Sequence, residues 1–171
     1  MKNTALESRL SNEISALLTQ QKTLQLATLD DEGKPYASYA PFAVMDQCIY
    51  LLLSEVAVHA KNLQQHPIAS VLIIEDEAHS ENIFARIRVN LQLSCEHLAL
   101  NSAQWQQGVN CLTERHGEMI THLSTMSDFH CFKLTPHKGR YVKGFGKAFA
   151  FENSLNGETL THLKEGHKKR A

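Results

Sequence analysis

The stretch KTLQLATLDDEGKPYASYAPF, residues 22–42, decides the fold of this 171-residue chain. Apolar and polar side chains alternate from Thr23 to Leu29, which is the two-residue period of a strand that buries one face. The five residues that follow, DDEGK, are typical of a tight turn, and Pro35 comes directly after them. This pattern predicts a β-hairpin whose returning strand runs over 36–44.

The same kind of pattern predicts the remaining strands. Five more are expected, over residues 48–53, 68–75, 83–96, 129–134 and 140–142. The strand over 48–53 is apolar at every position, so we expect it to be more deeply buried than the hairpin.

Three helices are predicted around these strands. The first covers 4–20, where apolar side chains recur at steps of three and four. The second covers 56–65 and ends before Pro67, because proline disfavours a helical residue in front of it. The third is expected to be capped by Asn101 and to reach about His116.

Successive hairpins with few crossover helices favour one fold class, α+β and mainly β, with an antiparallel sheet that curls into a barrel and carries flanking helices. A doubly wound parallel sheet would need a helix after almost every strand. No linker divides the chain, so we expect one structural domain. Its parts are an N-terminal helix over 1–20, the barrel over 21–155 and a polar tail over 156–171.

Composition excludes several classes of function. With 17 basic and 18 acidic residues the net charge is −1, which gives no broad basic field for nucleic acid or an anionic membrane. The longest apolar run is too short to span a bilayer and no signal peptide is visible, so we expect a cytoplasmic protein. The four cysteines form no C-x-x-C pair, which indicates free, mostly buried thiols.

Two arginines are candidates for anion binding. Arg86 and Arg88 are two apart, so on a strand over 83–96 both would project from one face. Two guanidinium groups on one face suit a phosphate or a propionate, whereas the alternative is a solvated or ion-paired strand face. Lys61, on the second helix, is either a further anion contact or an ordinary surface lysine.

The tail carries a second candidate group, in the block HLKEGHKK over 162–169. A neutral imidazole such as that of His167 is a good axial ligand for heme iron, and Gly166 would give it backbone freedom. The cations that follow over 168–170 would then meet the propionates. The alternative is a polar terminus that frays.

Taken together, several segments in the same order resemble the HutZ/HugZ family of bacterial heme-utilisation proteins. That family belongs to the split β-barrel group shared with pyridoxamine 5'-phosphate oxidase, the FMN-binding split-barrel type. The matching segments are KTLQLATLDDEGKPYASYAPF at 22–42, HAKNLQQHP at 59–67, IIEDE at 73–77, FARIRVNL at 84–91, RHGEMI at 115–120, YVKGFGKAF at 141–149 and HLKEGHKK at 162–169. Simple flavin-binding split barrels do not carry the last block.

The resemblance implies a homodimer that holds heme between its protomers. By motif position the iron ligand is His167, and the acidic partner of that ligand is Asp128, contributed by the other subunit. A carboxylate on the far ring nitrogen fixes the tautomer of a ligating histidine and raises its basicity. The arginine on the distal side of the heme falls at Arg86 or Arg88, and we favour Arg88.

The resemblance also implies a reaction, the oxidative opening of the porphyrin at a meso carbon. It consumes dioxygen and electrons from an external donor, and it releases iron for the cell. The same resemblance also admits heme storage or delivery, because binding a porphyrin does not prove that it is broken; our hypothesis is degradation. A third possibility is an FMN-binding oxidoreductase of the pyridoxamine-phosphate-oxidase type, in which Lys61, Ser38 and Arg86 would contact the phosphate.

Overall fold

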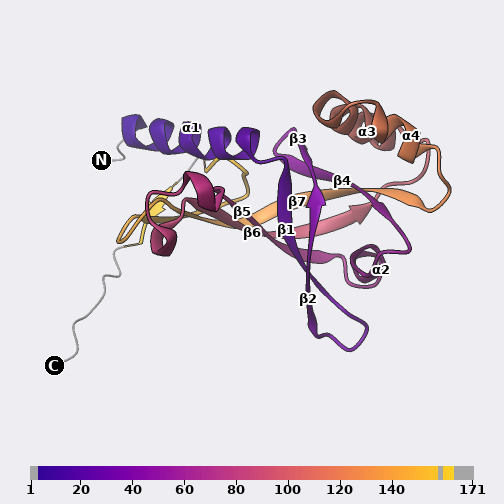
Figure 1. Ribbon diagram of the computed structural model, residues 1–171, viewed down its shortest axis with the longest axis horizontal. Helices are drawn as coiled ribbons and strands as arrows, with labels where there is room; N and C mark the ends of the chain where they lie inside the picture. Colours follow the sequence, from indigo (N-terminus) through magenta and orange to yellow (C-terminus); the bar gives the residue numbers. More distant parts are fainter. Residues whose placement is uncertain (1–3, 158–159, 164–171) are drawn as a thin grey trace.

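The computed structural model describes residues 4–157 and 160–163, which form one nine-stranded antiparallel sheet with α-helices packed on it (Figure 1). The strands are β1 (Thr23–Leu29), β2 (Pro35–Pro41), β3 (Ala43–Met45), β4 (Cys48–Ser54), β5 (Ile68–Ile74), β6 (Arg88–His97), β7 (Phe129–Val142), β8 (Ala148–Glu152) and β9 (Thr161–His162). The helices are α1 (Thr4–Gln20), α2 (Val58–Gln65), α3 (Ala103–His116) and α4 (Glu118–Ser124), with short 3-10 turns at Glu77–His79 and Ile83–Ala85.

The predicted hairpin is confirmed, but its returning strand ends at Pro41 instead of residue 44. The strand order is β2-β1-β5-β6-β7-β4-β3, so β2 and β3 lie at opposite ends of the path although only Phe42 separates them in sequence. The chain therefore crosses from one edge of the curled sheet to the other at Phe42, whose side chain is fully buried. The alternation of apolar and polar residues cannot reveal this break between β2 and β3, because the apolar pattern continues through Phe42.

Strand β7 is the largest correction to the predicted elements. The segments 129–134 and 140–142 are one continuous strand, and the residues between them pair with β6 around a register shift at Gln92 and Leu93. A proline can lie inside a strand where such an irregularity removes the need for its missing N–H, and Pro136 pairs with Leu93 there. The strand pairs with β6 along one edge, and with β4 and then β8 along the other.

Other boundaries also differ from the sequence-based expectation. Strand β6 begins at Arg88 and not at residue 83, because the Asn82 side chain accepts a hydrogen bond from the Phe84 N–H and starts a 3-10 turn. The cap of α3 is Ser102 and not Asn101, since the Ser102 hydroxyl accepts from the Trp105 N–H at 3.1 Å. Strands β3, β8 and β9 and helix α4 were not predicted as separate elements.

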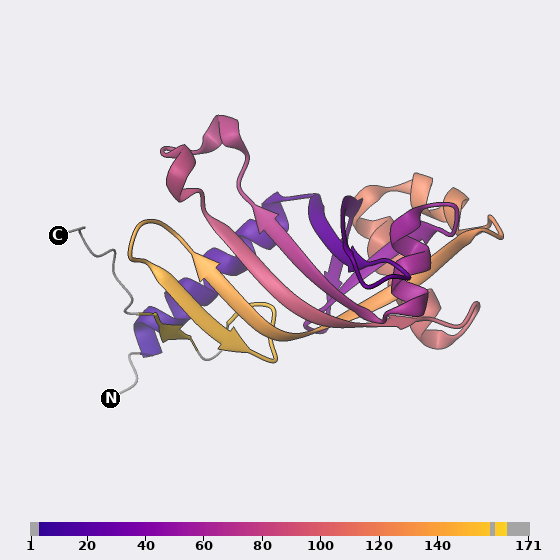
Figure 2. The same cartoon turned by 90° about the horizontal axis from the view of Figure 1, so that it is seen from below.

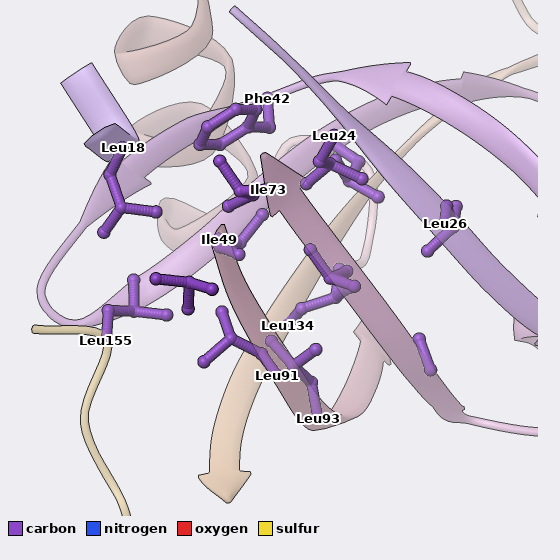
Figure 3. Packing of buried hydrophobic residues seen from close by; sticks show 14 of the residues in the cluster. Leu18, Leu24, Leu26, Phe42, Ile49, Ile73, Leu91, Leu93, Leu134 and Leu155 are labelled. Atoms are coloured by element: carbon purple, nitrogen blue, oxygen red, sulfur yellow. The ribbon is translucent and has the colours of Figure 1, made fainter. Parts of the chain in front are cut away.

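Two apolar clusters cover opposite faces of the sheet. The larger one joins α1 to the inner face of the strands, and Figure 3 shows Leu18, Phe42, Ile73, Leu134 and Leu155 converging in it. The smaller one packs α3 and α4 on the other face of β4 and β7. Strand β4 lies between the clusters, which is why its residues 48–53 are all buried, as predicted. None of the helices in the described ranges is long and apolar enough to cross a membrane.

The C-terminus of α1 is held by a side chain from α3. One terminal nitrogen of Arg115 donates to the carbonyl oxygens of Leu18 and Gln21 at 2.8 and 2.6 Å, and its guanidinium lies 4.9 Å from the centre of the Phe42 ring. A cation at a helix C-terminus satisfies free carbonyl groups and interacts favourably with the helix dipole. Arg115 therefore connects α1 and α3 at the crossing point of the chain.

Replacing Arg115 by methionine should lower the free energy of unfolding by about 2–3 kcal/mol, because the carbonyl groups at the end of α1 lose a charged donor. Urea unfolding followed by circular dichroism measures the change. Arg9→Met is the matched control, since Arg9 is an exposed residue of α1. Its loss should lower the free energy of unfolding by less than about 0.5 kcal/mol. Equal effects of the two substitutions would contradict this role of Arg115.

Candidate functional site

The candidate residues lie at the two ends of β7. Arg88 pairs with Val142, the last residue of the strand, whereas Asp128 immediately precedes Phe129, the first. The strand has 14 residues, which at ~3.3 Å per residue amounts to roughly 45 Å along its path. Figure 2 shows β8 and the 75–87 loop at one end of the molecule, and α2 with the start of β7 at the other. Arg88 and Asp128 of one chain therefore belong to different regions.

Arg88 lines a pocket of about 240 Å³ between the 75–87 loop and the β7–β8 hairpin. Two phenylalanines in its wall are exposed: Phe84 keeps 84% of its surface and Phe145 keeps 59%. Arg140, Gly144 and Leu163 also line it. The Arg88 guanidinium donates to the Arg86 carbonyl oxygen at 2.9 Å, and within residues 4–157 and 160–163 its other N–H groups make no hydrogen bond.

Arg86 does not share a strand face with Arg88, so that expectation was wrong. It precedes β6, and its guanidinium is held at the base of the 75–87 loop. There it donates to the Glu75 carbonyl oxygen at 3.1 Å and pairs with the Glu77 carboxylate at 3.2 Å. Its side chain is only 18% exposed. Arg86 thus holds the base of the 75–87 loop, and each nitrogen of its guanidinium already donates to Glu75 or Glu77.

The second guanidinium near Arg88 comes from Arg140, which sequence reasoning missed. Arg140 pairs with Asn90 in β6, two residues from the Arg88–Val142 pair, so the two arginines are diagonal neighbours on the outer face of the sheet. Nothing in the sequence indicates this, because 51 residues separate the two arginines and the register of β6 with β7 brings them together.

At the other end of β7, Asp128 is fixed by its neighbours. The Ser54 hydroxyl donates to its carboxylate at 2.7 Å, and the Glu55 N–H donates to its carbonyl oxygen at 2.7 Å. Beside it, the His130 ring is 3.0 Å from the Glu55 carboxylate. One carboxylate oxygen of Asp128 is thereby oriented, while the other has capacity for a further donor.

Ser38 contacts a histidine of α2, the helix that also carries Lys61. The Nδ1 atom of His59 lies 3.0 Å from the Ser38 hydroxyl, which itself donates to the Leu26 carbonyl oxygen at 3.3 Å. Burial lowers the pKa of His59, so its imidazole is held neutral. Lys61 is exposed on the same helix. Arg86 does not lie near these residues. It follows the end of β5 that is farther from α2.

The start of the tail belongs to the sheet. Strand β9 pairs with β8, and the His162 ring lies against Phe149 with its Nε2 atom 2.9 Å from the Gly146 carbonyl oxygen. The Leu163 N–H donates to the Ala148 carbonyl oxygen at 2.8 Å, so Leu163 forms part of the pocket wall beside Arg88. His167 and the cations over 168–170 lie outside the described residues.

The cysteines carry no nucleophilic site. All four are free, and three of them are buried, as predicted. Burial raises the pKa of Cys95 and of Cys131 to about 12, so neither forms a thiolate near neutral pH.

A family described as pyridoxamine 5'-phosphate oxidase matches residues 10–143. Over 99% of its length the chain is 40% identical to the Vibrio cholerae protein named heme oxygenase HutZ, covering 96% of that protein. The chain belongs to the HutZ family of split β-barrels. The resemblance noted in the sequence and the predicted fold class are thereby confirmed.

Two solved structures, those of HutZ and ChuZ, are similar to the chain. The crystal structure of V. cholerae HutZ, described as a heme storage protein, matches with a TM-score of 0.76 and 37% identity over 79% of this chain and 96% of that one. Campylobacter jejuni ChuZ matches with a TM-score of 0.84 and 30% identity over 95% of this chain and 67% of that one. A heme-binding protein from Mycobacterium smegmatis, 22% identical, shares the fold with a TM-score of 0.76.

The neutral state of His59 in this HutZ-family chain should appear in the pH dependence of stability. Its folded-state pKa is lowered, so the stability it contributes is present above the unfolded value of about 6.5 and is lost as the pH falls below that value and through the lower folded-state pKa. The urea midpoint of the wild type should therefore fall between pH 7.5 and pH 5.5, and by a smaller amount in His59→Gln. His79→Gln, at an exposed histidine, should keep the wild-type pH dependence.

Proposed function

We propose that this HutZ-family chain binds heme as its substrate and opens the porphyrin ring oxidatively, which releases iron. The observation that carries the proposal is the Arg88 pocket, whose wall includes Leu163, four residues before His167 in the sequence. Exposed Phe84 and Phe145 offer apolar surface to a flat macrocycle, and the arginines offer donors to its carboxylates. Near full-length similarity to a protein named heme oxygenase HutZ supports it.

His167 is the proposed axial ligand of the heme iron. The last described residue, Leu163, is in the pocket wall, and four further residues span at most about 14 Å, so His167 is within reach of the pocket. His162 is a weaker candidate, because the Gly146 carbonyl oxygen already engages its Nε2 atom.

Asp128 is proposed to orient His167 by accepting its second ring N–H. Within one chain the strand β7 separates Asp128 from the Arg88 pocket, so the carboxylate must come from a second protomer. The outer face of β1, β5 and β6 suits such a homodimer. It presents small or uncharged side chains that remain exposed or half-buried, namely Gln25, Ala27, Ser70, Leu72, Asn90 and Gln92.

Arg88 is proposed as the donor on the distal side of the porphyrin. Heme supplies the oxygen chemistry and is itself consumed, together with dioxygen and electrons from an external donor. The residues of the chain itself bind, orient and shield the ring. The N–H groups of Arg88, in a partly enclosed pocket, stabilise negative charge that develops during oxygen reduction.

Two alternatives are supported by specific findings. The description of V. cholerae HutZ as a storage protein favours heme storage or delivery without ring opening. The family match favours an FMN-binding oxidoreductase with a phosphate held by Ser38 and Lys61. Against FMN stands Arg86, whose guanidinium is already bonded to Glu75 and Glu77 and lies away from the other two residues.

Hemin titration of the purified protein tests binding and the ligand together. The wild type should give a stoichiometric Soret band, which His167→Ala should lose. His162→Ala is the matched control and should retain the band, because its ring is engaged elsewhere. The same band in the wild type and in His167→Ala would move the ligand to another residue, and a yellow flavin chromophore with no Soret band would favour FMN.

Turnover is tested by adding ascorbate and oxygen to the heme complex in the presence of catalase. The Soret band of the wild type should decay as the ring opens. Arg88→Gln should bind hemin but react about 100- to 1,000-fold more slowly, the loss expected when one donor to developing charge is removed. A wild-type spectrum that stays unchanged would replace degradation by storage or delivery.

A further inference from the structure

Arg140 has no charged partner among the residues that the structure describes. It projects from the outer face of β7, exposed, between Asn90 of β6 and Ala150 of β8. Across residues 4–157 and 160–163 it makes no hydrogen bond through its side chain and no ion pair. Glu152, the acidic residue on that face of β8, lies directly opposite Lys138 instead.

The position of Arg140 beside Arg88 is unfavourable unless an anion is bound. Diagonal neighbours on paired strands are ~7–8 Å apart, within reach of long side chains, and like charges at that spacing repel one another. Both arginines nevertheless line the same pocket of about 240 Å³. A negatively charged ligand would relieve the repulsion and would use donors that the protein leaves free.

The remaining walls of the pocket restrict the kind of anion. Phe84 and Phe145 are exposed phenylalanines on either side of it, and Gly144, Gly146 and Ala148 add little bulk. A small inorganic anion would leave these aromatic surfaces in water. A flat apolar molecule that bears a carboxylate would cover them and meet the guanidinium groups at once.

We propose that Arg140 is the residue that recognises a carboxylate of the ligand, so that the pocket selects a porphyrin with free propionates. This inference rests on the proposed function and deepens it, since Arg88 is left to face the centre of the ring. A guanidinium binds a carboxylate through two parallel hydrogen bonds, and an ester cannot accept these bonds with the same strength. Arg140 is therefore a specificity residue, and it takes no part in ring opening.

The experiment compares two ligands, hemin and its dimethyl ester, in which both propionates are blocked. Each is titrated into the full-length wild type, Arg140→Gln and Lys138→Gln, and binding is followed by the Soret band. Lys138 is the matched control: it is exposed on the same face of the same strand, two residues away, and it lies outside the Arg88 pocket. Removing either residue changes the net charge by the same amount.

The wild type should bind hemin more tightly than the ester. Arg140→Gln should weaken hemin binding about 10- to 100-fold, leave ester binding unchanged and so abolish the preference. Lys138→Gln should keep the preference within about threefold, because Lys138 does not line the pocket and so makes no direct hydrogen bond to a bound carboxylate.

Three results would overturn the inference. The first is that the wild type binds hemin and the ester with equal affinity. The second is that Arg140→Gln binds hemin as tightly as the wild type does. The third is that Lys138→Gln weakens hemin binding as much as Arg140→Gln does. In each case hemin still binds the wild type, so the proposed heme binding survives. If neither porphyrin gives a Soret band with the wild type, the proposed function and this inference fail together.

Discussion

The site depends on one constraint, the continuous backbone pairing of β7. This strand of 14 residues completes its hydrogen bonds with β6 along one edge and with β4 and β8 along the other. Because each pair is locked in register, every side chain on these strands has a set distance from every other. Arg88 and Arg140 consequently meet at one end of β7, while Asp128 remains at the opposite end, and no rotamer change can bring them together.

That separation gives the proposed dimer a physical basis. The carboxylate proposed to orient the heme ligand, that of Asp128, is displaced along a rigid strand from the pocket that Leu163 lines. In the proposed dimer, two protomers pair through the uncharged side chains on the outer face of β1, β5 and the middle of β6, and the end of one β7 then meets the pocket of the other. In this arrangement a complete site would exist only in the assembled dimer, so assembly and ligand binding would be linked.

The proposed binding of heme in place of FMN agrees with where this scaffold already engages its polar side chains. The Ser38–His59 contact near α2 is held by its own hydrogen bonds, and Arg86 is committed to the 75–87 loop. The pocket with free donors lies instead beside the β7–β8 hairpin. Glu13 of α1 supports that region, since its carboxylate accepts from the Tyr141 hydroxyl at 3.1 Å and pairs with Lys143. The first helix thus buttresses the strand end that carries the pocket.

The sequence by itself determined the local elements and the family. Alternation in β1, the DDEGK turn and the helical period of α1 depend on neighbours a few residues apart, and the structure has them at the predicted bounds. Only the tertiary structure decided the break at Phe42 and the continuity of β7 through Pro136. It also decided that Arg140, and not Arg86, lies beside Arg88 on the same face of the sheet. These features depend on register between strands that are distant in sequence, and side-chain periodicity is identical for every register that keeps the same face buried.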